Sequence, residues 1–245
     1  GGPLLVLIFY FSGINIEWIF MGYGIIVILT SLLVLLIKEI RIFENVRVVE
    51  NLKIVFGKKK NWTVFAFALF NAFVDGVIFL FIALYILFQG NFLVFVGGQI
   101  STGAIEESIE NQVLYGTNAI INLIIGVGVI VGAIIGGYLA DLKSRRISVY
   151  TSLIVTTISL LLFLIQAPFI VLLIFAFIVG SSNGWRNSGF SAVIGQVSTQ
   201  YPEVDSTYYA TCNSFANIGT VIGLICTNLI LGILEGGAVV FIFGV

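Results

Sequence analysis

Long apolar stretches separated by short polar turns recur along this sequence of 245 residues. A helix needs about 20 consecutive apolar residues to cross a bilayer, and six stretches reach that length. They cover approximately residues 18–37, 63–88, 114–140, 147–166, 168–190 and 206–232. Each end of the sequence is an apolar stretch of about half that length, so we expect a helix cut short at either end. The pattern predicts an all-α polytopic membrane protein with about six full spans and two partial ones.

The composition agrees with this prediction and excludes several kinds of chemistry. Only 9% of the residues are charged, whereas soluble domains carry roughly 25%. The chain has no histidine, which removes the usual metal ligand and the usual acid/base group at neutral pH, and we expect no metal and no cofactor. Cys212 and Cys226 lie roughly 21 Å apart along one predicted helix, too far for a disulfide.

The basic residues predict how the chain is oriented in the membrane. Of the 11 lysines and arginines, seven lie in residues 38–62 and three in residues 141–146. Two predicted spans separate these loops, so both lie on one side, which the positive-inside rule assigns to the cytoplasm. The opposite loops, 97–112 and 166–168, contain no lysine or arginine. We therefore expect a multi-pass protein of the plasma or inner membrane, in contact with membrane lipid.

The long basic stretch 38–62 has a helical pattern of its own. Apolar residues recur at spacings of three and four, which is the pattern of one helical face: they are Ile42, Val46, Val49, Leu52 and Phe56. This favours an amphipathic helix on the inner membrane surface. A solvated linker remains the alternative.

The sequence GGYLADLKSRR, residues 136–146, resembles the signature loop of the major facilitator superfamily, which joins two helices on the cytoplasmic side. The matching positions are Gly137, Leu139, Ala140, Asp141, Arg145 and Arg146, whereas Leu142 and Ser144 depart from the pattern. In that family the second copy of the loop follows the eighth of twelve helices. The resemblance implies that the chain runs from a partial fifth helix to a partial twelfth helix.

On this register the resemblance divides the chain into three parts. Residues 1–37 end the N-terminal transporter half, residues 38–62 form the cytoplasmic linker, and residues 63–245 form the C-terminal half. The missing N-terminal helices of the same protein would then be its partner. The resemblance also implies a cytoplasmic gate made by Gly137, Asp141, Lys143, Arg145 and Arg146. The three basic residues of this set could instead act only as topology anchors.

Asp75 lies near the middle of the span 63–88, where an ionised carboxylate costs about 2.5–3.5 kcal/mol on insertion scales. We favour a role in proton or cation coupling, or direct contact with a substrate. The alternative is a protonated or hydrogen-bonded aspartate that uses Asn71, one turn earlier. Asp75 is the most informative single residue of the sequence.

Arg186 lies late in the span 168–190, with Asn183 on the same helical face and Asn187 directly after it. It could contact an anion, or it could extend to the interface as a snorkelling arginine. Asp75 and Arg186 lie at comparable depths, roughly 20 and 18 Å from the inner ends of their helices if the second helix continues to Ser198. We therefore expect that the two side chains can pair.

Two further patterns involve small and polar residues. Asn213, Asn217 and Thr220 form a polar stripe that either lines a cavity or, as we favour, bonds to neighbouring helices. Gly128, Gly132 and Gly136 repeat every four residues, a spacing that lets helix backbones approach closely. Static packing and sliding between transporter elements are both open as the role of these glycines.

These features favour a secondary transporter that moves a small solute by alternating access, with protons or another ion as an open choice of coupling. A receptor or scaffold of the same fold that does not transport is the alternative. A membrane-embedded enzyme is a weaker one, because the sequence lacks a metal-ligand cluster, a phosphate loop and paired carboxylates within a span. No feature indicates binding to nucleic acid.

Overall fold

The computed structural model describes residues 25, 28–29, 48–90, 93–96, 99–102 and 107–233. The chain divides into two compact units, one made of Gly1–Val46 and Ala104–Leu123, the other of Arg47–Gly103 and Ile124–Val245. Most of the described residues belong to the second unit. The packing and the candidate site described below are internal to that unit.

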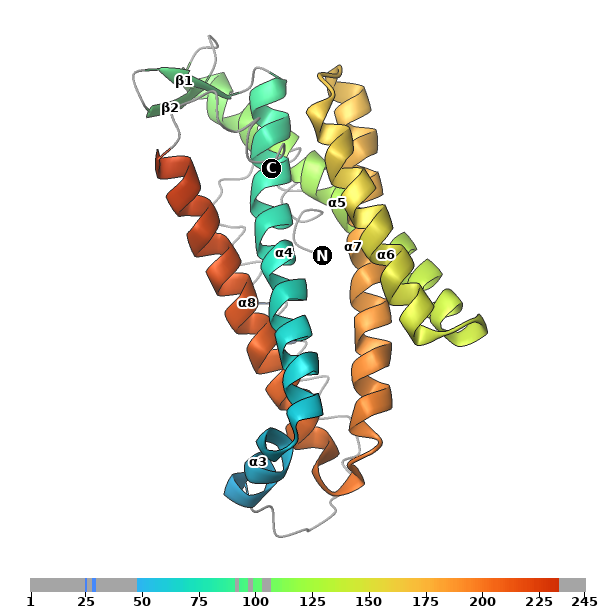
Figure 1. Cartoon of the computed structure of the whole chain (residues 1–245). Coiled ribbons are helices and arrows are strands. Elements are labelled where there is room, and N and C mark those ends of the chain that lie inside the picture. The colour runs from blue at the N-terminus through green and yellow to red at the C-terminus, as the bar shows by residue number, and fades with distance from the viewer. Residues whose placement is uncertain are drawn as a thin grey trace. The chain divides into compact units, whose positions relative to one another are not determined.

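The regular secondary structure of the described residues is helical apart from one short β-hairpin (Figure 1). The elements, in chain order, are α3 Val48–Gly57, α4 Lys59–Gln89, β1 Leu93–Val96, β2 Gln99–Thr102, α5 Glu107–Leu142, α6 Arg145–Leu161, the 3-10 turn η1 Leu162–Leu164, α7 Phe169–Ser198, the 3-10 turn η2 Pro202–Val204 and α8 Asp205–Ile233.

Five helical segments in this described part are long and apolar enough to cross a membrane. They are Lys59–Leu87, Gly116–Leu142, Arg145–Leu164, Phe169–Ser198 and Pro202–Cys226. They correspond to five of the six predicted spans, which are confirmed as long apolar helices. The span predicted over 18–37, apart from three helical positions, and both partial helices lie outside the described residues.

The region predicted as a polar loop, 97–112, differs from the prediction. Strands β1 and β2 pair antiparallel with Val96 opposite Gln99, and α5 then begins at Glu107. A Gly-Gly pair between two short runs is typical of a two-residue hairpin connection, and in the sequence Gly97 and Gly98 separate the two strand segments. The sequence therefore contained a hairpin signal that the reading of this segment as a loop missed.

The helix predicted within 38–62 is present as α3, and its packed face differs from the predicted one. Val55 is buried, Leu52 and Phe56 are half-buried, and Val49 is 67% exposed. The helix packs against α8 and α4 on a face centred near Val55, which is rotated away from Val49. Ile42 and Val46 lie outside the described residues.

The junction between α3 and α4 is closed by side chains that bind the last carbonyls of α3. Asn61 donates from Nδ2 to the carbonyl of Val55 at 2.8 Å, and Trp62 donates from Nε1 to that of Phe56 at 3.1 Å. Such carbonyls have no partner within their own helix. The Lys58 ammonium lies 4.2 Å from the ring centroid of Tyr201, so this junction and the α7–α8 turn lie at the same end of the unit.

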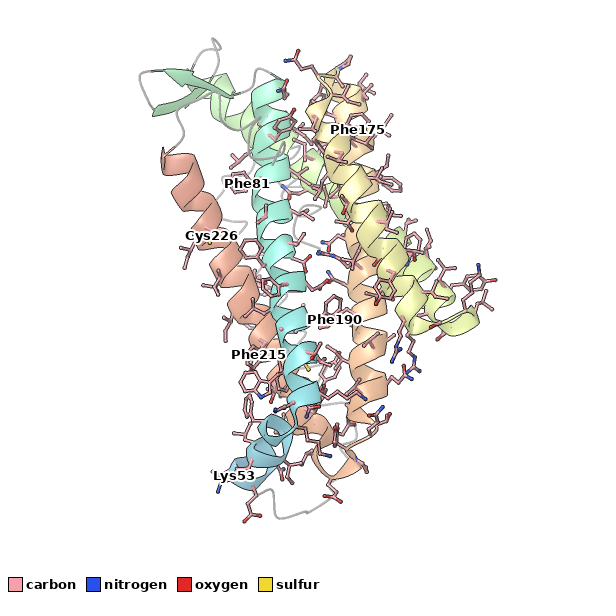
Figure 2. All side chains as sticks on the ribbon, viewed as in Figure 1. Lys53, Phe81, Phe175, Phe190, Phe215 and Cys226 are labelled. Carbon is pink, nitrogen blue, oxygen red and sulfur yellow. The ribbon has the colours of Figure 1, made fainter. Side chains whose placement is uncertain are left out.

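An aromatic cluster fills the same end, where α4 and α8 meet (Figure 2). The rings of Phe65 and Phe215 stack at 5.1 Å between centroids, and Phe65 also contacts Tyr208 at 5.7 Å. Phe65, Tyr208 and Cys212 have no exposed surface. This cluster anchors α3 to the two long helices. Cys212 and Cys226 are both free thiols, as their predicted separation requires.

Glycines bring α5 and α7 into direct backbone contact. A Cβ at Gly132 would overlap the carbonyl of Ser181, and one at Gly184 would overlap the carbonyl of Val129. The other glycines at this contact are Gly128, Gly136 and Gly180. Because both helices contribute glycines, each backbone fits into the groove of the other.

A second glycine contact joins α4 to α8. A Cβ at Gly219 would overlap the carbonyl of Leu69, and one at Gly76 would lie 2.6 Å from the carbonyl of Thr220. Gly223 extends the contact by one turn. The second unit thus contains two closely packed helix pairs, α5–α7 and α4–α8.

Helix α6 joins the first of these pairs through hydrogen bonds. Ser148 donates from Oγ to the carbonyl of Gly136 on α5 at 3.0 Å and accepts from Trp185 Nε1 on α7 at 3.0 Å. Further along, the hydroxyls of Ser159 and Ser182 lie 3.2 Å apart. Three helices therefore form one packed group, α5–α6–α7.

The outer faces of these helices are apolar rather than polar. Ile130 and Ile134 on α5 are 63% and 68% exposed, and Ile154 and Ile158 on α6 are 59% and 55% exposed. They recur at a spacing of four residues, so each row lies along one face. A surface of this kind suits lipid and is unfavourable in water. The exposed rows and the long apolar helices both indicate a membrane protein.

Candidate functional site

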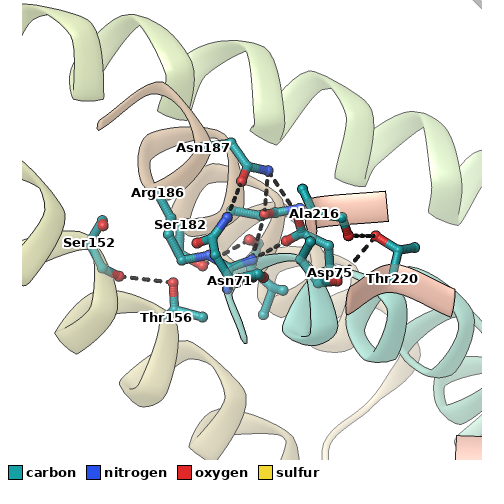
Figure 3. A network of polar contacts seen from close by, with 12 residues as sticks. Asn71, Asp75, Ser152, Thr156, Ser182, Arg186, Asn187, Ala216 and Thr220 are labelled. Atoms are coloured by element: carbon teal, nitrogen blue, oxygen red, sulfur yellow. Dashed lines mark hydrogen bonds and ion pairs between the residues drawn. The ribbon is translucent and has the colours of Figure 1, made fainter. Parts of the chain in front are cut away.

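The candidate site lies where α4 of one helix pair meets α7 of the other. Asp75 on α4 and Arg186 on α7 form an ion pair through Oδ1 and Nη2 (Figure 3). Asp75 is roughly 24 Å from the start of α4, and Arg186 is roughly 18 Å from the end of α7, at about 1.5 Å per residue. The ion pair is therefore far from both helix ends, and Arg186 does not extend to the interface.

The Arg186 guanidinium is held from three directions. Besides its bond to Asp75, it donates from Nη1 to the backbone carbonyl of Asn71 at 3.2 Å and from Nη2 to Asn183 Oδ1 at 2.9 Å. The arginine side chain is 1% exposed and that of Asp75 is 18% exposed. These acceptors stabilise the buried guanidinium, because an unpaired charge in an apolar interior is very unfavourable.

Three asparagines complete the network. Asn187 donates from Nδ2 to Asp75 Oδ2 at 3.2 Å and to Asn183 Oδ1 at 3.0 Å. Its own Oδ1 accepts from Asn71 Nδ2 at 2.9 Å. The structure thus brings together all five residues that the sequence singled out in these two spans: Asn71, Asp75, Asn183, Arg186 and Asn187. Asn71 binds Asn187 rather than Asp75, which differs from the pairing considered for it.

Three buried polar atoms of the network have no hydrogen-bond partner among the residues that the structure describes. They are Arg186 Nε and Asn183 Nδ2, which are donors on α7, and Asn71 Oδ1, an acceptor on α4. Buried polar groups are paired in the great majority of cases, so such atoms call for an explanation. Two donors and one acceptor of the network are therefore not used by the described side chains.

Apolar contacts flank the network on both sides along α4. Toward the α3 end, the rings of Phe67 and Phe190 meet edge to face at 5.1 Å between centroids. Toward the other end, the rings of Tyr85 and Phe163 meet edge to face at 5.6 Å between centroids, and the Tyr85 hydroxyl also donates to the carbonyl of Phe163 at 2.6 Å. The charged network therefore lies between two apolar contacts that also join α4 to the group α5–α6–α7.

The network carries one negative and one positive charge and can change by one proton. A guanidinium stays protonated in proteins, whereas a carboxylate can take up a proton. Protonation of Asp75 would remove the counter-charge of Arg186 and leave a buried cation without its partner. Protonation of Asp75 would therefore favour binding of another negative group to Arg186.

The polar stripe predicted on α8 divides in the structure. Thr220 donates from Oγ1 to the carbonyl of Ala72 on α4 at 3.3 Å, so it bonds to a neighbouring helix. Asn213 and Asn217 are exposed instead, and the hydrogen bonds of the network do not include them. The three residues differ in their depth along α8 and in their rotation about its axis. Their spacing in the sequence does not show which of them meets a neighbouring helix.

The residues of the predicted gate lie at the turn between α5 and α6. Asp141, Lys143 and Arg146 are exposed, and Arg145 is half-exposed. Within the described residues, Asp141 forms no ion pair. Among the described residues, a Cβ at Gly137 would meet the Ser188 hydroxyl alone, at an ordinary 3.5 Å, so packing within this part of the chain does not demand glycine at this position.

Sequence reasoning missed Ser148 and the backbone carbonyl of Asn71, which bind across helices. A serine in a serine- and threonine-rich helix carries no distinctive signal, and a carbonyl carries none. In the described part of the chain, no group of three or more histidine, cysteine, aspartate or glutamate side chains is placed to hold a metal ion. Comparisons with protein-family models, with curated proteins and with solved structures find no match.

Proposed function

We propose that this chain acts as a secondary transporter of the major facilitator type, moving a small solute across the membrane by alternating access. The proposed solute- and proton-binding site is the network around Asp75 and Arg186. The observation that carries the proposal is this ion pair, which lies far from the ends of two apolar helices. Charged residues inside membrane segments are unfavourable, and they mark ion and substrate pathways.

The packing supports a moving site. The network joins two helix pairs, each of which is held together by direct backbone contact between glycines. Transporters bind substrate between elements that rock against each other, near the middle of the bilayer. Bonds across such a junction would break and re-form during the cycle, whereas the glycine contacts would persist.

The turn after α5 supports the second part of the proposal, a cytoplasmic gate. Asp141 carries a negative charge at a helix end where the macrodipole disfavours it. A carboxylate in this position would be stabilised by the amino end of a neighbouring helix. We assign to Asp141 the role of a latch that holds the inner side closed, with Gly137, Lys143, Arg145 and Arg146 around it. Asp141→Asn should raise the accessibility of the network around Asp75 and Arg186 from the cytoplasmic side, and unchanged labelling by cytoplasmic probes would contradict this assignment.

The test of transport is solute uptake into proteoliposomes with and without a pH gradient. The wild-type chain should accumulate solute, and Asp75→Asn should abolish the dependence on the gradient. Asp205→Asn is the matched control, because it makes the same chemical change at an exposed position at the start of α8. Binding of solute with no uptake would favour a receptor or scaffold instead. Turnover of a lipid in detergent would favour an enzyme.

A further inference from the structure

We propose that the network binds a small organic anion, whose carboxylate takes the place of the Asp75 carboxylate on Arg186 while Asp75 holds a proton. This inference rests on the proposed function and deepens it by naming the class of solute. The solute would be a carboxylate small enough to lie between α4 and α7.

The first observation is that the network already binds a carboxylate, its own. Arg186 and Asn187, which are neighbours on α7, donate to the two oxygens of Asp75. A planar group with two acceptor oxygens therefore fits these donors. Arginine is the residue best suited to such a group, because its donors match the geometry of a carboxylate.

The second observation is the set of buried polar atoms that have no hydrogen-bond partner in the described part of the chain. Arg186 Nε and Asn183 Nδ2 are both donors, and both belong to side chains that are 1% exposed. The orientation of the Asn183 amide is fixed, because its Oδ1 accepts from Arg186 and from Asn187. A carboxylate group supplies acceptors only, so it would satisfy the donors on α7 that the described residues leave unpaired.

A cationic solute fits the same site poorly. It would bind Asp75, the more exposed member of the pair, and compete with Arg186 for its counter-charge. Arg186 would then remain buried without a counter-charge, held only by the neutral acceptors of Asn71 and Asn183, and a buried charge that loses its ionic partner is strongly destabilising. The two unpaired donors on α7 would also stay unpaired. Unused donors outnumber the single unused acceptor, Asn71 Oδ1, and this decides in favour of the anion.

The exchange balances in charge. The Asp75 carboxylate gains one proton and becomes a neutral acid, its ionic bond to Arg186 breaks, and the solute carboxylate forms the new one. The network is neutral before and after, because the proton and the anion enter together. Binding of either should therefore favour binding of the other by the same factor.

Among the described side chains, Arg186 is the charged group that faces Asp75. On α4 itself, Lys59 and Lys60 lie roughly 22 Å or more from it along the helix, and α3 contributes charges only near that same end. On α8, Thr220 bonds to the carbonyl of Ala72, three residues before Asp75. The titratable side chains of α8 lie away from it along the helix: Asp205, Tyr208, Tyr209 and Cys212 by at least two turns, and Cys226 by roughly 9 Å. The turn η1 has no titratable side chain.

The test is direct binding of probe anions to the intact chain in detergent, by calorimetry between pH 5.5 and 8. The probes are acetate, lactate, benzoate and succinate, with choline as the cationic comparison. For the wild type, the dissociation constant of the best carboxylate should rise about tenfold per pH unit wherever Asp75 is ionised in the free protein, as linkage to one proton requires. Calorimetry in two buffers of different ionisation enthalpy should show about one proton taken up.

Variants provide the second arm. Asp75→Asn carries the neutral state permanently, so it should bind the carboxylate without pH dependence, whereas Arg186→Gln should lose binding at least tenfold. Asp205→Asn should behave as the wild type. The pH dependence of the wild type tests the proposal even where a variant fails to fold.

Some results would overturn the proposal. They are no binding of any of the four carboxylates to the wild type, binding that does not vary with pH, or binding of choline in their place. Uptake of choline into proteoliposomes under a pH gradient would remove this inference and leave the transport proposal standing. Carboxylate binding with the expected pH dependence, but without any uptake, would remove the transport proposal and leave the anion site.

Discussion

The contact between α5 and α7 can be tested by adding one methyl group. Gly132→Ala places a Cβ where the carbonyl of Ser181 lies, and a backbone atom cannot rotate away as a side chain can. The two helices must therefore separate. Gly126→Ala is a matched control on the same helix, because a Cβ at Gly126 would meet no atom of the described residues within 4 Å.

The expected changes in the free energy of unfolding have opposite signs in the two variants. Replacing glycine by alanine inside a helix stabilises it by about 0.5–1 kcal/mol, and this is the whole effect expected for Gly126→Ala. At Gly132 the overpacking penalty of about 1–3 kcal/mol opposes that gain. We expect the two variants to differ by about 2 kcal/mol, which corresponds to roughly 4–8 °C in the midpoint of unfolding for a chain of this length.

The assay is thermal unfolding of each purified variant in the same detergent, followed by intrinsic fluorescence. Gly126→Ala should unfold at or slightly above the wild-type temperature, and Gly132→Ala should unfold below it. The reasoning would be refuted if Gly132→Ala unfolded at the temperature of Gly126→Ala or above it, because the backbones could not then be in contact at Ser181.

Three further predictions concern single side chains. Ser148→Ala removes the acceptor of the Trp185 indole and should lower stability by about 1–3 kcal/mol, measured against Thr151→Ala, whose hydroxyl bonds only within its own helix. A double-mutant cycle of Asp75→Asn and Arg186→Gln tests the ion pair. The free energy of unfolding should fall by about 3–5 kcal/mol in the Asp75 single variant and by less in the double variant, because the double variant leaves no buried charge unpaired. Additive losses would show that the two groups do not interact. Asn213→Cys, in a background of Cys212→Ser and Cys226→Ser, should react with a small maleimide much faster than Cys212 of the wild type, because Asn213 is exposed and Cys212 is buried. Equal slow rates of reaction would contradict the exposure of this face of α8.

Much of the helical layout could be predicted because a membrane span has a strong local signal. The length and apolarity of a segment depend on its own residues, so five predicted spans appear as helices in the described part of the chain. The prediction for α3 was less accurate. Its pattern gave a helix, but Val49 lies off the packed face, because the buried face is set by where α8 and α4 lie rather than by spacing within α3.

The candidate site was partly predictable for a similar reason. A carboxylate and an arginine inside apolar stretches are conspicuous, and equal depth along two helices suggested that they could pair. Spacing alone did not reveal that Asn213 and Asn217 are exposed while Thr220 bonds to α4. Which side of a helix faces which neighbour depends on packing between segments far apart in the chain.

The sequence by itself determined the elements of this protein: where apolar helices run, where charges are rare, and which charged residues must find partners away from water. The tertiary structure decided the partners. It placed the glycines of α5 against those of α7 and the glycines of α4 against α8, and it brought Asp75 to Arg186 at the junction of the two pairs. The physical reason is range: helix formation and burial in lipid are local properties of a segment, whereas an ion pair between residues 111 positions apart depends on how complete helices pack.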